Sequence, residues 1–212
     1  MEPHKVILYD MFFRRIVINA LLVGALFSAF CLTGCGRGRI EESTLVINKD
    51  GSVNSIIVDA FDKYYYNEAD LEKSANEEVE RYNAEHGKDT VRIRSLKTGD
   101  DGSVRAELSF RTSEDYARFN ETRFFAGTVK EAEEKGYVFT TALKSVDGEN
   151  ETISSHEVIL ERADSHIVIT DETIDLRMYS KIQYVSPGVT VVSPKEARVE
   201  DDMEGLAYVI FK

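Results

Sequence analysis

Two Asp-Gly dipeptides constrain the fold of this chain more than any other feature of its sequence. Each lies in the tetrapeptide DGSV, at residues 50–53 and 101–104, between segments in which apolar and polar residues alternate. Asp-Gly readily adopts the positive φ angles of a tight two-residue turn, and alternation is typical of a half-buried strand. We therefore predict two β-hairpins with strands at 44–48, 53–60, 90–96 and 104–110. Because Asp and Gly are so favoured in hairpins, the repeated tetrapeptide does not by itself indicate a sequence repeat.

A long helix is predicted directly after the first hairpin. Asn67, with Asp70 three residues later, has the pattern of a helix N-terminus, and Gly87 is typical of a helix end. The apolar residues between them recur at helical spacing: Leu71, Ala75, Val79 and Tyr82. Because this apolar stripe is narrow, we expect one face to pack on the core and the Glu-rich face to meet solvent.

Two shorter helices are predicted after the second hairpin. Ser113 is the expected N-cap of the first, and Thr128 with Glu131 forms a capping box for the second, which ends at Gly136. The apolar segment 124–127 between them is expected to be a buried plug that joins the two helices.

The remainder of the chain is predicted to be mainly strands. We expect a strand from Tyr137, a turn at 147–148, a short helix from Ser154, and an apolar closing strand at 206–211 that pairs inside the sheet. Further strands are expected at 167–170, 174–178, 182–185 and 189–192. This order predicts one α+β domain over residues 44–212, a mostly antiparallel sheet built from hairpins with several short helices packed on it.

The N-terminal segment has the layout of a secretory signal. Arg14 and Arg15 precede a nearly uninterrupted apolar run over residues 16–32. The run is longer than the roughly 7 to 15 residues of an ordinary signal core and reaches the low end of the roughly 17 to 25 of a spanning helix. Length alone therefore leaves both interpretations open. Met1 and Met11 are both candidates for the true start.

The residues at the end of the apolar run favour the cleaved signal. They are Leu32, Thr33, Gly34 and Cys35. This motif resembles the lipobox of bacterial lipoproteins, and the resemblance implies cleavage before Cys35 and acylation of that cysteine. Residues 1–34 would then be the signal peptide and 35–43 the acylated cysteine and its tether. The alternative is an uncleaved membrane anchor whose cysteine is incidental. The rest of the chain is similar to uncharacterised lipoproteins of unknown function.

Composition narrows the choice of partners. The net charge is −12, and no basic cluster occurs beyond the Arg37 and Arg39 of the tether. Phosphate binding needs a positive footprint, so we expect no nucleic-acid partner. The only cysteines are Cys31, which would leave with the signal, and Cys35, which would be acylated. The mature domain is therefore expected to be stable without a disulfide.

The sequence offers weak evidence for a metal site. Neither Asp-Gly turn has the ligand positions of an EF-hand loop. The densest acidic group comprises Asp201, Asp202 and Glu204, which we treat as weak candidates for a divalent cation against the alternative of a solvated loop. His86, His156 and His166 lack zinc-site spacing. We therefore predict no metal and no cofactor.

No recognisable catalytic motif occurs, so we expect a protein that is not an enzyme. The chain contains no nucleophile elbow and no Gly-rich phosphate loop. Paired carboxylates, as in glycosidases, are set by the fold rather than by sequence spacing, so a carboxylate-dependent hydrolase of cell-wall or glycan material stays the alternative.

The most unusual local feature is a run of tyrosines. Tyr64, Tyr65 and Tyr66 precede Asn67, and an exposed ring beside an amide is suited to stacking on a sugar. The alternative places two of the rings in the core. We predict a lipid-anchored binding or envelope-accessory protein outside the cytoplasm. Its partners would be the membrane, through the N-terminal lipid, and an envelope protein or glycan.

Overall fold

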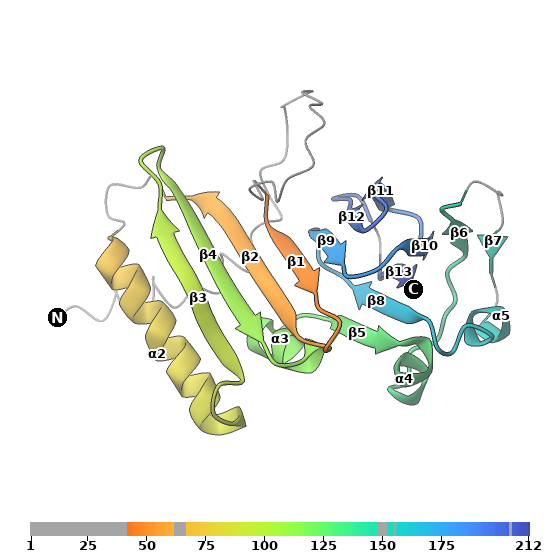
Figure 1. Cartoon of the computed structure of the whole chain (residues 1–212), viewed down its shortest axis with the longest axis horizontal. Helices are drawn as coiled ribbons and strands as arrows, with labels where there is room; N and C mark the ends of the chain where they lie inside the picture. Colours follow the sequence, from red (N-terminus) through yellow and green to blue (C-terminus); the bar gives the residue numbers. More distant parts are fainter. Residues whose placement is uncertain (1–41, 62–66, 148–151, 155, 204) are drawn as a thin grey trace.

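The chain folds into helices and two mostly antiparallel sheets, which confirms the α+β prediction (Figure 1). The computed structural model describes residues 42–61, 67–147, 152–154, 156–203 and 205–212. The sequence patterns indicated most of the strands but gave no sign that they divide between two sheets.

The larger sheet has seven strands in the order β11-β12-β9-β1-β2-β4-β3. They are β1 (Thr44–Ile47), β2 (Val53–Ala60), β3 (Val91–Thr98), β4 (Ser103–Phe110), β9 (Asp175–Met178), β11 (Val189–Ser193) and β12 (Glu196–Val199). β1 pairs with β9 in parallel, and the other neighbours in this sheet are antiparallel. The parallel pairing joins the two predicted hairpins to the C-terminal part of the chain. β12 was missed by the sequence analysis.

Both DGSV segments turn hairpins, but by three-residue loops rather than two-residue turns. In the first, the Asn48 N–H donates to the Ser52 carbonyl at 2.9 Å, and Gly51 has φ of +83°. Asp50 does not share the positive φ; its Oδ1 accepts the Ser52 N–H at 3.1 Å and the Ser52 hydroxyl at 2.6 Å. This is the common three-residue hairpin loop, in which a type I turn is followed by a glycine with positive φ that forms a β-bulge.

The second hairpin repeats this loop. The Gly99 N–H donates to the Ser103 carbonyl at 2.8 Å, Gly102 has φ of +73°, and Asp101 Oδ1 accepts from the Ser103 N–H and hydroxyl. The two hairpins lie side by side through the antiparallel pairing of β2 with β4.

A β-bulge in β3 explains an irregular apolar pattern. The register with β4 shifts between Ile93 and Ser95, so that Arg94 is the inserted residue. The bulge returns Leu96 to the face of Val91 and Ile93, and all three pack on the core. Bulges and charged side chains are also common protections of an edge strand, which β3 is.

The long helix matches its prediction. α2 (Glu68–His86) is capped by Asn67, whose side chain accepts the Asp70 N–H at 3.1 Å, and it ends at Gly87. Its buried residues are Leu71, Ala75, Val79 and Tyr82. Asn83 holds the helix to the edge of the sheet, because its side chain bonds both the N–H and the carbonyl of Val91.

The N-cap of the next helix differs from the prediction by one residue. α3 (Ser113–Asn120) is capped by Thr112, which has an extended backbone and accepts the Asp115 N–H at 3.1 Å. Ser113 already lies in the first turn, where its hydroxyl donates to the Ala126 carbonyl at 3.1 Å. Sequence spacing alone does not distinguish adjacent Thr and Ser as caps.

The segment expected to be a plug is a strand. β5 (Phe124–Thr128) pairs with β8 (His166–Thr170) at the edge of the second sheet. A buried apolar segment needs partners for its backbone N–H and C=O groups, and β8 provides them. The capping box after β5 is confirmed: Thr128 Oγ1 accepts the Glu131 N–H, and Glu131 accepts the Thr128 N–H. α4 (Val129–Glu134) thus begins directly at the end of β5.

The second sheet has six strands in the order β5-β8-β13-β10-β6-β7. Its remaining members are β6 (Leu143–Ser145), β7 (Thr152–Ile153), β10 (Ile182–Val185) and β13 (Ala207–Phe211), with α5 (His156–Leu160) between β7 and β8. All of β13 is buried between β8 and β10, so the closing strand pairs inside a sheet as predicted. The strand expected from Tyr137 begins only at Leu143.

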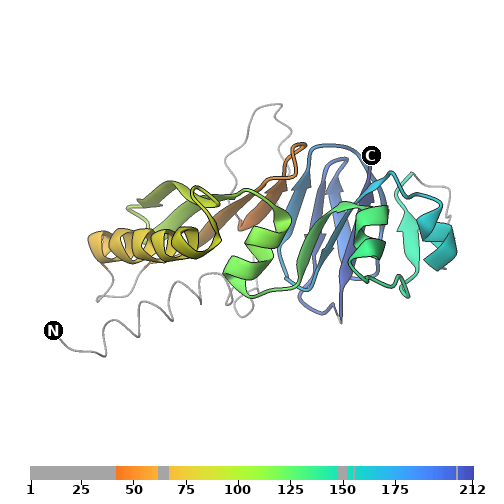
Figure 2. The ribbon, with the colours of Figure 1, turned by 90° about the horizontal axis from the view of Figure 1, so that it is seen from below.

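The two sheets share one large core. It combines the inner face of the seven-stranded sheet, α2, Tyr116 of α3 and one face of the six-stranded sheet. A second cluster packs α4 and Ile159 of α5 on the other face of the six-stranded sheet. Figure 2 shows α2 and α3 on one side of the strands. Among the described residues, no helix is long and apolar enough to cross a membrane.

Candidate functional site

The predicted ligand-binding residues are only partly described. Tyr64, Tyr65 and Tyr66 lie outside the described residues, as does Cys35. Asn67 is exposed, and its side-chain oxygen caps α2. An amide engaged in this way has a structural role that is independent of any ligand, so the sugar-binding hypothesis for this segment stays a prediction.

The acidic loop does not assemble a metal site among the described residues. Asp201 and Asp202 are exposed in the turn before β13, and Glu204 lies outside the described residues. No group of three His, Cys, Asp or Glu side chains suited to a metal ion occurs in the described part of the chain. The three histidines among the described residues are on separate elements: His86 ends α2, His156 begins α5 and His166 begins β8.

The most unusual polar group in the described structure is the carboxyl of Glu172. It lies in the loop from β8 to β9, where the chain passes from one sheet to the other. The fully buried Tyr116 of α3 donates its hydroxyl proton to Glu172 Oε2 at 2.8 Å. Oε1 is buried as well, and it has no hydrogen-bond partner among the described residues. A buried acceptor without a donor disfavours the charged form of the carboxyl.

A second carboxylate lies next to it. Asp171 Oδ2 accepts from Arg123 Nε at 2.8 Å, and Oδ1 accepts from the Thr122 hydroxyl at 3.0 Å. The Arg123 N–H adds a contact at 3.2 Å. Asp171 is therefore fixed by hydrogen bonds from the loop between α3 and β5, while Glu172 beside it is turned toward the buried Tyr116.

The surroundings of Glu172 change its protonation. Burial raises the pKa of Glu172 from 4.5 to about 7, and the negative charge of Asp171 acts in the same direction, while the hydrogen bond from Tyr116 opposes the rise. Burial also raises the pKa of Tyr116 well above 10, so the phenol keeps its proton. Glu172 is thus a group that binds and releases a proton near neutral pH, a property typical of functional carboxyls.

Sequence reasoning missed this pair. Tyr116 and Glu172 are 56 residues apart, and the chain holds 38 Asp and Glu residues. Nothing in the local pattern distinguishes Glu172 from the acids around it. The only available signal was its position between two apolar strands.

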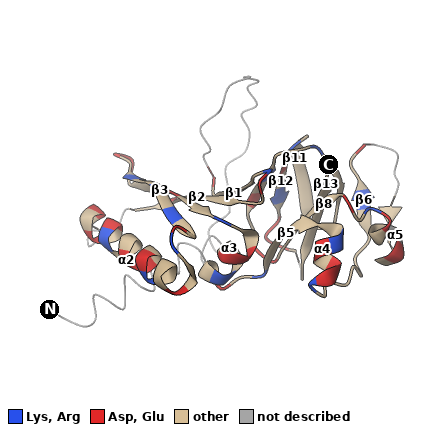
Figure 3. Cartoon of the chain, turned by 60° about the horizontal axis from the view of Figure 1, so that its bottom comes forward, with Lys and Arg blue, Asp and Glu red and all other residues tan. Residues whose placement is uncertain are grey.

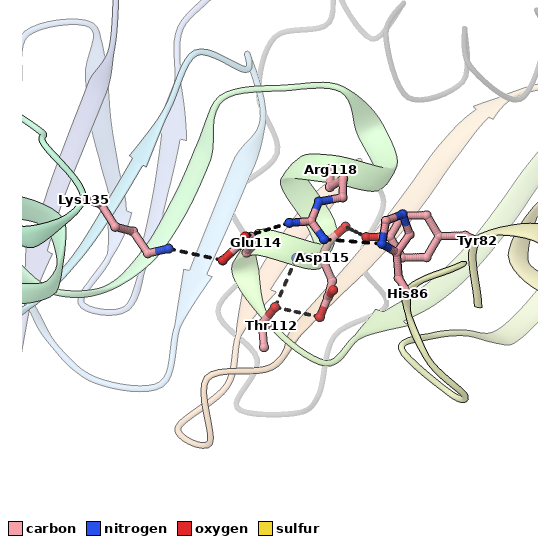
Figure 4. Close-up of polar contacts among 7 residues, drawn as sticks. All are labelled: Tyr82, His86, Thr112, Glu114, Asp115, Arg118 and Lys135. Carbon is pink, nitrogen blue, oxygen red and sulfur yellow. Dashed lines mark hydrogen bonds and ion pairs between the residues drawn. The ribbon is translucent and has the colours of Figure 1, made fainter. Parts of the chain in front are cut away.

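A polar network connects three helices on the surface (Figure 4). Glu114 of α3 accepts from Arg118 at 2.8 Å and from Lys135, after α4, at 3.2 Å. The hydrogen bond from Lys135 is the main cause of the lowered pKa of Glu114. Arg118 also reaches His86 Nδ1 at 3.4 Å, and Tyr82 donates to the Asp115 carbonyl at 3.4 Å. The network fixes α3 between α2 and α4.

The face of the seven-stranded sheet opposite α2 and α3 is the broadest candidate binding surface. We call it the outer face. Among the described elements no helix covers it (Figure 3). Its side chains alternate with those of the core. Most are polar or charged: Asn54, Arg92, Arg94, Lys97, Arg105, Glu107, Asp175, Arg177, Glu196 and Arg198. At its centre the pairing also places Val46, Val58 and the buried Thr44 and Ile56.

Opposite charges on the outer face pair near β1. Arg177 Nε lies 2.7 Å from Glu196 Oε1, and Arg198 Nε lies 2.7 Å from Asp175 Oδ1. Arg198 also contacts Glu42, the first described residue. The side chain of Glu42 thus lies on the outer face.

Comparisons with known proteins give no relative. No family model, no curated protein and no solved structure matches the chain significantly.

Proposed function

We propose that this protein is lipid-anchored through Cys35 and acts outside the cytoplasm as a binding or envelope-accessory protein without catalytic activity. The observation that carries the proposal is the apolar segment that ends in Leu-Thr-Gly-Cys and leads, through a short tether, to a folded domain beginning at β1. Two or three acyl chains on one cysteine make a durable attachment, because each buried methylene contributes about 0.8 kcal/mol.

The outer face supports a binding role. It spans strands from β3 to β12, presents both charged and aliphatic side chains, and is left open by α2 and α3. A broad surface of this kind suits a macromolecular partner or a membrane surface better than a small ligand. An envelope protein or a glycan is the partner class that we propose for the domain as a whole.

The anchor is tested with the two cysteines. In a bacterial host, Cys35→Ser should abolish incorporation of labelled palmitate and leave the precursor uncleaved, whereas Cys31→Ser, the matched control, should be labelled and processed like the wild type. The intact mass of the purified protein shows whether the signal peptide has been cleaved and whether acyl chains have been added. Labelling that survives in Cys35→Ser would refute the proposal.

The second candidate is a carboxylate-dependent hydrolase, favoured by the proton-binding Glu172. A general acid needs a pKa near the working pH, which Glu172 has at about 7. Hydrolysis of cell-wall fragments by the wild type, lost in Glu172→Gln and retained in Glu161→Gln, would favour this function over the first. We expect no hydrolysis by any of the three proteins.

A further inference from the structure

We propose that the β3–β4 half of the outer face lies against the anionic phospholipid headgroups of the membrane to which the protein is attached. The inference rests on the proposed lipid anchor and adds to it an orientation and a lipid-binding surface. The surface is the basic patch, which comprises Arg92, Arg94, Lys97 and Arg105.

The fold places these four side chains on one face. Arg92 lies opposite Ser109 and Lys97 opposite Arg105, in positions that alternate with the buried residues of β3 and β4. Arg94 belongs to the bulge, and its Nε donates to the Ser109 hydroxyl at 3.0 Å, so it reaches the same face. Without the bulge, strict alternation would place Arg92 and Arg94 on the outer face and Lys97 on the core face. With the bulge, all three cations of β3 reach the outer face.

Acidic residues also lie near the basic patch. Glu107 is the acid within these two strands, Asp100 and Asp101 lie in the loop that joins them, and Asp89 pairs with Arg92 at 3.2 Å in an exposed contact. Exposed ion pairs of this kind contribute little to stability. The fold thus gathers four cations on one face of a chain with a net charge of −12.

The opposite side of the sheet has the opposite charge. The exposed positions of α2 include Glu68, Asp70, Glu72, Glu77, Glu80 and Glu85. Figure 3 shows acidic segments along α2 and basic segments on β3, the strand against which α2 packs. Near an anionic bilayer, this charge separation attracts the outer face and repels the helix side.

The tether brings the same face to the membrane. Glu42, where the described chain begins, contacts Arg198 on the outer face. Six residues separate it from Cys35, and a fully extended chain of these seven residue steps spans at most about 25 Å. A lipid on Cys35 therefore keeps Glu42 within about 25 Å of the bilayer, and the charge of the basic patch would turn the outer face toward the headgroup phosphates.

The test uses the full chain, processed and acylated by a bacterial host and reconstituted into vesicles. Because acylation occupies Cys35 and cleavage removes Cys31, one added cysteine is the only free thiol. A fluorophore is placed at Lys97→Cys in the basic patch or at Lys73→Cys on α2, two exposed positions that each lose one positive charge. Quenching by a headgroup-linked nitroxide reports which side faces the lipid. Vesicles contain phosphatidylcholine alone or mixed with phosphatidylglycerol.

In the anionic vesicles we expect several-fold stronger quenching at position 97 than at position 73. High salt should reduce the difference, since the Debye length falls to about 3 Å at 1 M. Adding Arg92→Gln, Arg94→Gln and Arg105→Gln should remove it, because each basic residue near an anionic surface contributes about fivefold to the preference. The control Lys73→Cys, Arg81→Gln should not gain quenching.

The possible failures are distinguishable. Acylated protein, verified by mass, with equal quenching at the two positions would overturn the orientation and leave the anchor intact. Stronger quenching at position 97 that is insensitive to phosphatidylglycerol and salt would overturn the role of the basic patch. Protein that carries no acyl chains, whether its signal peptide is cleaved or it stays in the membrane uncleaved, would overturn the proposed function, and with it the orientation.

Discussion

Replacement of Glu172 by Gln should remove a large part of the pH dependence of stability. A carboxyl whose pKa is raised in the folded state is destabilising when it is charged. The stability associated with Glu172 is therefore fully present below its unfolded pKa of 4.5 and is lost as the pH rises through about 7. Gln has nearly the same shape, can accept the Tyr116 hydrogen bond and does not ionise.

The size of the effect follows from the change in pKa. A rise from 4.5 to about 7 corresponds to about 3 kcal/mol between about pH 4 and about pH 8. Glu172 as a residue is only partly buried although Oε1 is buried, so we expect about 2 to 3 kcal/mol. Any constant cost of burying the Gln amide cancels, because the comparison is between pH values within one variant.

Urea unfolding of the wild type, Glu172→Gln and Glu161→Gln over this pH range measures the effect. The free energy of unfolding of the wild type should fall with rising pH by about 2 to 3 kcal/mol more than that of Glu172→Gln. Glu161→Gln, at an exposed site, should follow the wild type. Tyr116→Phe should steepen the fall, because it removes the hydroxyl that favours the charged carboxyl. Parallel curves for the wild type and Glu172→Gln would refute the reasoning.

Three further predictions concern the fold and are measured by thermal and urea unfolding. Asn67→Ala should cost about 1 kcal/mol by removing the cap of α2, while Asn67→Asp should cost much less; equal losses would show that the cap is not the cause. Gly51→Ala should cost about 1 kcal/mol because φ is +83° and no atom lies within 4 Å to clash, and Gly51→Asn should be milder. Leu176→Ala should cost about 2 to 5 kcal/mol by opening a cavity in the core, against about 0.5 kcal/mol or less for the exposed Thr190→Ala.

Local patterns were reliable where a few neighbouring residues decide the structure. The four buried residues of α2, its cap and its end all follow from spacing and from Asn67 and Gly87. Both hairpins were also recognised, although Asp50 and Asp101 turned out to be side-chain acceptors rather than residues with positive φ. Such details depend on loop length, which the dipeptide alone does not specify.

The candidate sites were harder to predict because they join distant segments. Tyr116 and Glu172 meet only because β8 and β9 belong to different sheets and α3 packs at their junction. The basic patch was invisible in a chain of overall negative charge, because its cations are separated in sequence by buried residues and by a hairpin. Ligand binding by Tyr64, Tyr65 and Tyr66 and acylation of Cys35 stay predictions.

The sequence by itself determined the fold class and most element boundaries, since turns and caps are short-range patterns, and the lipid anchor stays a prediction. Tertiary structure alone decided the division into two sheets, the parallel pairing of β1 with β9, and the burial of one carboxyl among many. The physical reason is that pairing register and desolvation arise from contacts between segments far apart in the chain. A residue's own neighbours carry almost no information about them.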